Sequence, residues 1–235
     1  MPELNDERYV RELFADLYGV ELRKVPESNT KTFDYELLSN EQRVAAVEVK
    51  RLGVVPRTPG NGWVRTEGGF STRPGGDNGP SRVGDAIHKA YQQLATTTDP
   101  KVLVFLNDEY LIDLLDLHEA VNGYLVYGND QTGRFKNPSG MRIAQGRIKA
   151  EKLAIDLYVW INRYEGRTPH RVDGQPLEAH AQRGPFFRCT SDAGYELGRR
   201  YFNMPEAPKP ESVPDADVPT LQEMLLREAG IKRRG

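Results

Sequence analysis

Hydrophobic residues recur at helical spacing near the start of the chain, before the pattern changes to short alternating runs. A first helix is predicted from Asn5 or Asp6, either of which can cap it, to Tyr18, with Gly19 as its stop. Its buried stripe is formed by apolar residues three or four positions apart: Val10, Leu13, Phe14 and Leu17.

Three short strands are predicted next, over residues 20–25, 32–38 and 44–52. Turn-rich segments separate them, so we expect an antiparallel meander. Residues 53–81 are dense in glycine and proline, and a compact domain seldom keeps so long a loop without a use for it.

Helical spacing returns over residues 82–96, and the apolar run 101–106 is typical of a strand buried on both faces. The remaining predicted elements are a helix at 110–121, strands at 124–127, 153–161 and 186–189, and a helix at 192–202. Together these predict an α/β (α+β) fold with a mixed central sheet flanked by helices.

The chain divides into three predicted regions. Residues 1–127 form the core, including the loop 53–81, and residues 128–204 add strands and a helix packed on that core or extending it. Residues 205–235 form an acidic, proline-rich tail with a short helix near 220–229.

Charged residues interrupt two of the predicted strands. Asp34 and Glu36 share one face of the second strand, and Phe33, Tyr35 and Leu37 share the other. The neighbouring third strand is mostly apolar, so acidic side chains on the second strand lie beside a buried part of the predicted sheet.

Glu48 and Lys50 share a face of the third strand, whose other residues are apolar. Burying both ions costs several kcal/mol each unless they have partners, and Asp34 is the nearest candidate. Carboxylate oxygens are the ligands that Mg²⁺ prefers, and a nearby ammonium group can stabilise charge on a phosphate. The alternative is that Glu48 and Lys50 lie on the solvated face of an edge strand.

These residues resemble the signature of the PD-(D/E)XK nucleases, the family with the restriction-endonuclease-like fold. The matching residues are FDYEL, thirteen intervening residues after Asp34, and then the Glu-Val-Lys of VAAVEVK. Phe33 stands where proline is commonest in that family. The resemblance implies an αβββαβ core, Mg²⁺ or Mn²⁺ bound by Asp34 and Glu48, and Lys50 acting beside the metal.

Two further positions fit that family pattern. Many members have a metal-binding glutamate on the first helix, and Glu7 is preferred to Glu12 because it lies one turn before Val10. Members often have a glutamine or lysine on the helix after the third strand. Gln92 and Gln93 both qualify here, and the sequence does not choose between them.

Composition narrows the remaining functions. The net charge of −2 argues against a general nucleic-acid coat protein, but arginines and aromatics cluster locally. Contacts with nucleic acid are expected from the segment around the loop 53–81, namely from Arg51, Arg57, Trp63, Arg65, Arg73 and Arg82. The basic segment 131–152 could add backbone contacts. The single cysteine excludes an internal disulfide, and we expect a cytoplasmic protein with no membrane segment.

The function expected from these features is metal-dependent hydrolysis of phosphodiester bonds, in DNA rather than RNA. Many nucleases of this fold dimerise to cut two strands, so a homodimer stays open. One alternative is a non-catalytic nucleic-acid-binding or protein-interaction module on the same fold. In another, the acidic tail 205–223 and the terminal helix dock a partner.

Overall fold

The structure is a computed structural model that describes residues 5–26, 32–53, 64–65, 71–72, 79–109, 112–129, 133–137, 148–163 and 185–204. The helical elements are α1 (Asn5–Tyr18), α2 (Gly79–Leu94), α3 (Leu114–Asn122), the 3₁₀ turn η2 (Glu151–Leu153) and α5 (Asp192–Tyr201). The strands are β1 (Glu21–Lys24), β2 (Tyr35–Ser39), β3 (Gln42–Leu52), β4 (Val64–Arg65), β5 (Ser71–Thr72), β6 (Lys101–Asn107), β7 (Leu125–Asn129), β8 (Gly133–Asn137), β9 (Leu157–Asn162) and β10 (Phe186–Cys189).

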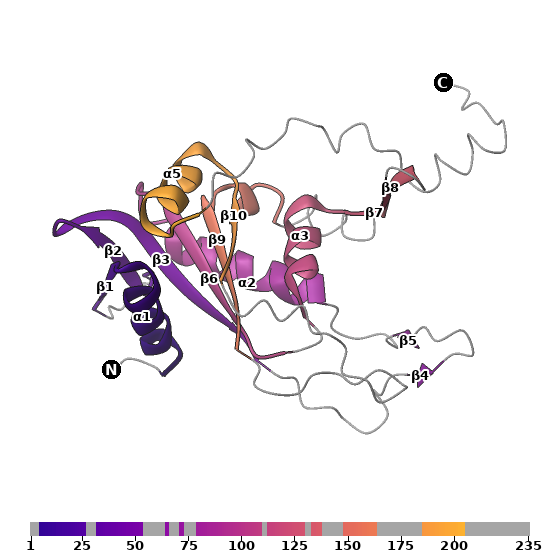
Figure 1. Cartoon of the computed structure of the whole chain (residues 1–235), viewed down its shortest axis with the longest axis horizontal. Helices are drawn as coiled ribbons and strands as arrows, with labels where there is room; N and C mark the ends of the chain where they lie inside the picture. Colours follow the sequence, from indigo (N-terminus) through magenta and orange to yellow (C-terminus); the bar gives the residue numbers. More distant parts are fainter. Residues whose placement is uncertain are drawn as a thin grey trace.

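A six-stranded mixed sheet in the order β1-β2-β3-β6-β9-β10 organises the chain (Figure 1). The first three strands form the predicted antiparallel meander, β3, β6 and β9 run parallel, and β10 returns antiparallel to β9. The mixed α/β class is therefore confirmed. The carboxyl ends of the three parallel strands meet at one edge of the sheet.

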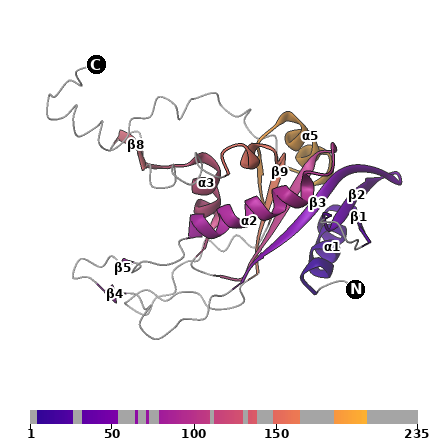
Figure 2. The same ribbon diagram turned by 180° about the vertical axis from the view of Figure 1, so that it is seen from behind.

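Helices cover both faces of this sheet. α1 and α5 lie on the face turned toward the viewer in Figure 1, and α2 crosses the opposite face, which Figure 2 shows from behind. Each face has its own buried cluster, in which Val10 and Phe14 of α1 join one, and Ile87 and Ala90 of α2 join the other. β6 is buried on both sides, as its apolar run predicts.

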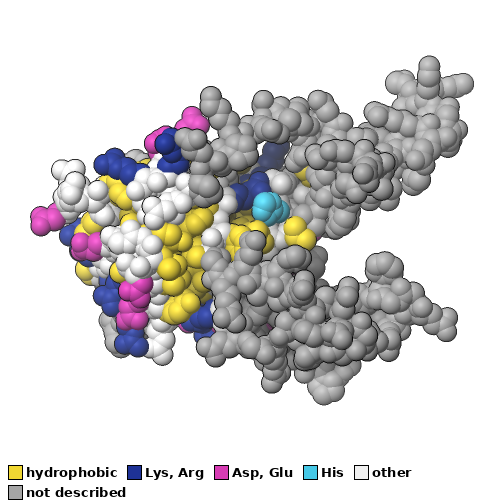
Figure 3. Space-filling view, viewed as in Figure 1, with side chains coloured by type: hydrophobic (Ala, Val, Ile, Leu, Met, Phe, Trp, Pro, Cys, Tyr) yellow, Lys and Arg dark blue, Asp and Glu magenta, His cyan; other side chains and the backbone are white. Residues whose placement is uncertain are grey.

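The surface of the α1 side is partly apolar. Figure 3 shows hydrophobic side chains gathered between α1, α5 and β10, with acidic and basic groups spread beside them. On the same side of the sheet, the rings of Tyr18, Phe187 and Phe202 pack edge-on or tilted against one another. The buried stripe of α1 is narrower than predicted, because Leu17 is 50% exposed.

Local sequence explains how the meander begins and turns. Gly19 ends α1 with a φ of 64°, a left-handed conformation that glycine adopts without strain. The β2–β3 hairpin turns through Asn40 and Glu41, both with positive φ, as its two-residue loop requires.

One predicted strand face is wrong. Asp34 lies at a bend just before β2, although its backbone N–H still donates to Val47 O at 3.1 Å. Because the chain bends there, Phe33 packs in the α2-side cluster, whereas Tyr35 and Leu37 pack on the α1 side. Phe33 therefore does not share a face of the sheet with Tyr35 and Leu37, although the sequence pattern predicted a shared face.

Several later boundaries also differ from the sequence pattern. α2 begins at Gly79, before the predicted start, and α3 begins at Leu114, directly after its N-cap Asp113, which forms a capping box with Asp116 of the first turn. The run 153–161 begins in η2, and only Leu157–Asn162 forms β9, because the chain turns onto the sheet at Ile155 and Asp156. β7 pairs with β8 in a separate two-stranded sheet, while β9 joins the central sheet. The predicted helix 220–229 lies outside the described residues.

None of the helices in the described part of the chain has both the length and the apolar character needed to cross a membrane.

Candidate active site on β2, β3 and α2

Asp34 reaches the site from the bend before β2. Its Oδ2 accepts a hydrogen bond from the backbone N–H of Val49 at 2.8 Å, which fixes the carboxyl group against β3. Burial raises the pKa of Asp34, the Val49 N–H opposes that rise, and the negative charge of Glu7 adds to it. The side chain therefore lies close to acids from two other elements.

Glu48 and Lys50 share the α2 face of β3, as the strand alternation predicts. Glu48 is fully buried, and Lys50 Nζ donates to Glu48 Oε1 and, at 2.6 Å, to Gln93 Oε1. Gln93 in turn donates to the backbone oxygen of Thr32 at 3.3 Å. Lys50 is therefore held between β3 and α2 by two oxygen acceptors.

The carboxyl group of Glu48 is in an unfavourable environment for a charge. Burial, and next the negative charge of Asp34, raise the pKa of Glu48 to about 8, although the Lys50 ammonium acts in the opposite direction. As a carboxylate oxygen, its Oε2 atom is buried and has no hydrogen-bond donor among the described residues, and a proton on Glu48 would be shared with Asp34. A buried oxygen in that condition is costly to the fold, so it calls for a ligand or a proton.

Glu7, the predicted ligand from the first helix, lies on the other side of Asp34. Its Oε2 accepts a hydrogen bond from Lys24 Nζ, and the same ammonium nitrogen is 3.8 Å from Asp34 Oδ1. Lys24 therefore stands between two of the carboxylates.

The structure separates the two candidate glutamines. Gln93 faces the site, whereas Gln92 Nε2 lies 3.0 Å from Nε2 of His88, whose Nδ1 is 2.9 Å from Glu151 Oε1. Consecutive helical residues point about 100° apart, so only one of the two can reach Lys50.

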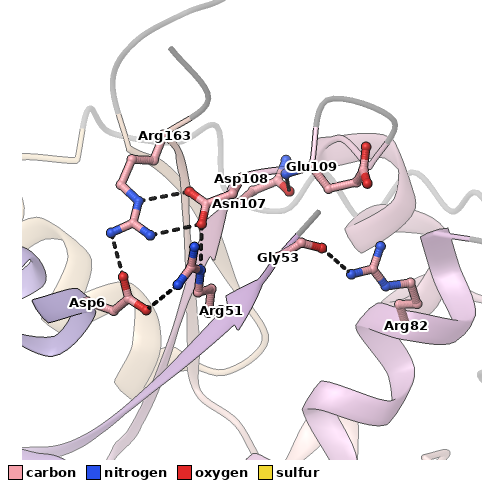
Figure 4. A network of polar contacts seen from close by, with 8 residues as sticks. All are labelled: Asp6, Arg51, Gly53, Arg82, Asn107, Asp108, Glu109 and Arg163. Carbon is pink, nitrogen blue, oxygen red and sulfur yellow. Dashed lines mark hydrogen bonds and ion pairs between the residues drawn. The ribbon is translucent and has the colours of Figure 1, made fainter. Parts of the chain in front are cut away.

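Two of the predicted nucleic-acid contacts have partners within the protein (Figure 4). Arg51 joins a charge quartet, which we define as Asp6, Arg51, Asp108 and Arg163, and Arg82 donates to the backbone oxygen of Gly53 at 2.6 Å. Arg65 belongs to β4, but its side chain is not described. Arg57, Trp63 and Arg73 lie outside the described residues, as do residues 205–235 of the tail.

The charge quartet closes where the parallel strands end. Arg163 binds both Asp108 oxygens, at 2.8 and 2.9 Å, and Asp6 Oδ1 at 2.7 Å. Arg51 contacts the same two carboxylates, at 2.6 Å to Asp108 and 3.3 Å to Asp6. These hydrogen bonds lower the pKa of Asp108 and raise that of Arg163. The quartet thus ties the first turn of α1 to the ends of β3, β6 and β9.

The carboxylates of Asp34 and Glu48 fit a divalent metal ion. They offer hard oxygen ligands, and Glu48 Oε2, which has no hydrogen-bond donor in the described part of the chain, is a buried oxygen that a cation would satisfy. Within the described parts of the chain, no group of three or more His, Cys, Asp or Glu side chains gathers around a common point. Two carboxylates with water molecules would suit Mg²⁺, which gives up its waters reluctantly.

Sequence reasoning missed Lys24 and most of the quartet. A signal for Lys24 was present, because it shares a strand face with the buried Leu22, so its side chain points inward from β1. Asp108 and Arg163 each follow the end of an apolar strand directly, which is where parallel strands bring polar side chains together.

Comparisons with known protein families, with curated proteins and with solved structures found no match for this chain. The candidate site therefore stands on its own geometry.

Proposed function

We propose that this chain is a metal-dependent nuclease of the PD-(D/E)XK type that hydrolyses phosphodiester bonds, with DNA as its substrate. The observation that supports this most directly is the meeting of Asp34, Glu48, Lys50 and Gln93 from three elements that are distant in sequence. A buried carboxylate oxygen to which none of the described residues donates, beside a second carboxylate and a hydrogen-bonded ammonium, is typical of a functional site, because a purely structural cluster would satisfy each group.

Each side chain has a separate role in the proposed reaction. Asp34 and Glu48 would hold Mg²⁺ or Mn²⁺, which when bound polarises the phosphoryl group and lowers the pKa of an attacking water. Lys50 is oriented by Glu48 and Gln93, so its positive charge is already in place to stabilise negative charge that develops on the phosphate. Gln93 acts through Lys50 as a positioning residue.

Asp34 is oriented before any ligand binds. The backbone N–H of Val49 donates to Oδ2 of Asp34, and because the carboxyl group is planar this bond also sets the direction of Oδ1. Such preorganisation matters, because a site that must rearrange to bind the substrate loses part of the stabilisation that it could give to the transition state.

The test is cleavage of supercoiled plasmid, linear duplex, single-stranded DNA and RNA, with Mg²⁺, Mn²⁺ or EDTA. Glu48→Gln keeps the shape of the side chain and removes its charge, so we expect cleavage to fall by at least about 100-fold. Glu36→Gln is the matched control, because Glu36 pairs with Arg23 and Arg43 away from the site. It should cut like the wild type.

Two outcomes would contradict the proposal. Equal cleavage by wild type and Glu48→Gln would show that the activity lies elsewhere. A folded wild-type protein that binds nucleic acid but cuts none of the substrates would favour the non-catalytic binding module.

A further inference from the structure

We propose that Lys24 is a built-in counter-ion that limits the site to one divalent metal ion and keeps Glu7 out of its coordination. The inference rests on the proposed metal-dependent nuclease site. It concerns a residue outside the D…E-x-K signature and changes the role that the resemblance implies for Glu7.

The position of Lys24 is fixed by its backbone pairing in the sheet and by three contacts of its ammonium group. It is the last residue of β1 and pairs with Tyr35 of β2, whose ring centroid is 5.2 Å from Lys24 Nζ. The ammonium group donates to Glu7 Oε2 and lies 3.8 Å from Asp34 Oδ1. Because the side chain is only 28% exposed, protein groups replace much of the hydration of its charge.

The charges of the site divide into two halves around Asp34. On the α2 side, the Lys50 ammonium donates to Oε1 of Glu48 and balances its negative charge. Oε2 of Glu48 has no hydrogen-bond donor among the described residues. On the α1 side, Lys24 binds Glu7 and lies beside Asp34. Among the described residues, only the α2 side therefore keeps a buried carboxylate oxygen that needs a cation.

A second metal ion would need the α1 side. Paired catalytic ions lie about 3.5–4 Å apart and share a bridging ligand, so a second ion would sit between Asp34 and Glu7. Lys24 Nζ already lies between those carboxylates, and it would repel a divalent cation placed there. Asp34 and Glu48 remain as the carboxylates for one ion.

The stoichiometry of Mn²⁺ tests this inference without measuring catalysis. Free Mn²⁺ can be counted by electron paramagnetic resonance during titration of the metal-free full-length protein. We expect one ion per chain for the wild type and two for Lys24→Met, which keeps the length of the side chain and removes its charge. Adding Glu7→Gln to Lys24→Met should restore one ion.

A matched control comes from the same strand. Arg23 is the neighbour of Lys24 on β1 and also pairs with a carboxylate, Glu36, but on the opposite face. Arg23→Met removes an equal charge and should still bind one ion. A second ion in this control would show that loss of any nearby cation suffices, which would overturn the specific role of Lys24.

Glu7→Gln alone gives a second measurement that does not require Lys24→Met to fold. If Glu7 is not a ligand, the Kd for the first Mn²⁺ should change by no more than about threefold. A loss of about tenfold or more would identify Glu7 as a ligand and overturn the proposal. One ion in Lys24→Met, or two in the wild type, would also overturn it.

Failure of the metal site itself would look different. In that case wild type and Glu48→Gln would both bind no Mn²⁺, and the proposed function would fall together with this inference. Binding by the wild type that Glu48→Gln abolishes would keep the metal site, whatever the stoichiometry of Lys24→Met.

Discussion

Two charged clusters lie on this sheet, and they treat their carboxylates in opposite ways. In the charge quartet, each Asp contacts both arginines, and these contacts lower the pKa of Asp108. In the candidate active site, burial raises the pKa of both Asp34 and Glu48. The charge quartet satisfies its charges, whereas the candidate active site keeps an acid in a place where its ionisation is unfavourable.

From these opposite pKa shifts we infer that the charge quartet stabilises the fold, whereas the candidate active site serves a function. An acid in an ion pair is favoured in its charged form, and the pair stabilises the folded state. An acid whose ionisation is disfavoured by burial destabilises the folded state when charged, and a bound cation can offset that cost. The clusters are also neighbours in sequence, because Asp6 precedes Glu7 and Arg51 follows Lys50. We infer that the quartet holds the frame on which the carboxylates are placed.

The largest stability effect is expected from breaking the quartet. Among the described residues, Arg163→Met leaves Asp6 and Asp108 with the exposed Arg51 as their cation. Because the cluster is only partly buried, the free energy of unfolding should fall by about 2 kcal/mol, between the values for exposed and buried pairs. Urea denaturation at pH 7 measures the change. Arg23→Met, which removes a cation from an exposed pair, should cost less than about 1 kcal/mol. Equal losses in both variants would contradict the role given to the quartet.

A substitution in the candidate active site is expected to change the free energy of unfolding in the opposite direction. Burial and the negative charge of Asp34 raise the pKa of Glu48 to about 8, so ionisation of this side chain at pH 8 destabilises the folded state. Glu48→Gln keeps an oxygen that can accept from Lys50 and cannot ionise, so the metal-free protein should become more stable by about 1–2 kcal/mol. Urea denaturation in EDTA at pH 8 measures it. A destabilised Glu48→Gln would mean that Glu48 supports the fold, and the contrast between the clusters would disappear.

The smallest expected effect is a pH dependence of the stability that Asp108 contributes to the charge quartet. Hydrogen bonds from Arg163 lower the folded-state pKa of Asp108 below its usual 3.8. A depressed carboxyl pKa gives stability that is present above the unfolded-state pKa and is lost as the pH falls through the folded-state pKa. The stability difference between wild type and Asp108→Asn should therefore shrink by about 1 kcal/mol between pH 5 and pH 2, because solvent screens part of the interaction. A difference that stays constant over this range would argue against a charged Asp108 in the folded state.

Much of the site was predictable because its geometry is local. Residues two positions apart on a strand share a face, so the pairing of Glu48 with Lys50 followed from the sequence. Asp34 was identified as their partner, although the bend that places it before β2 was not. The bend goes together with the packing of Phe33 on the α2 side, and periodicity along a single strand does not report on such packing.

The choice between Gln92 and Gln93 could not be made from the pattern. Both are polar residues on the same helix, and the rotation of α2 against β3 decides which one reaches Lys50. That rotation depends on how the apolar face of α2 packs against the sheet, through residues such as Ile87 and Ala90. The same reason explains why Lys24 was missed, since its partners Glu7 and Asp34 lie in other elements.

Spacing along the chain was enough to predict the types of the main elements, the antiparallel meander and the shared face of Glu48 and Lys50. Three-dimensional packing places β9 beside β6, joins Arg51 to Asp6 and Asp108, and brings Lys24 close to both Glu7 and Asp34. These contacts join residues far apart in sequence. They depend on the packing of the whole sheet and its helices, which local periodicity does not encode.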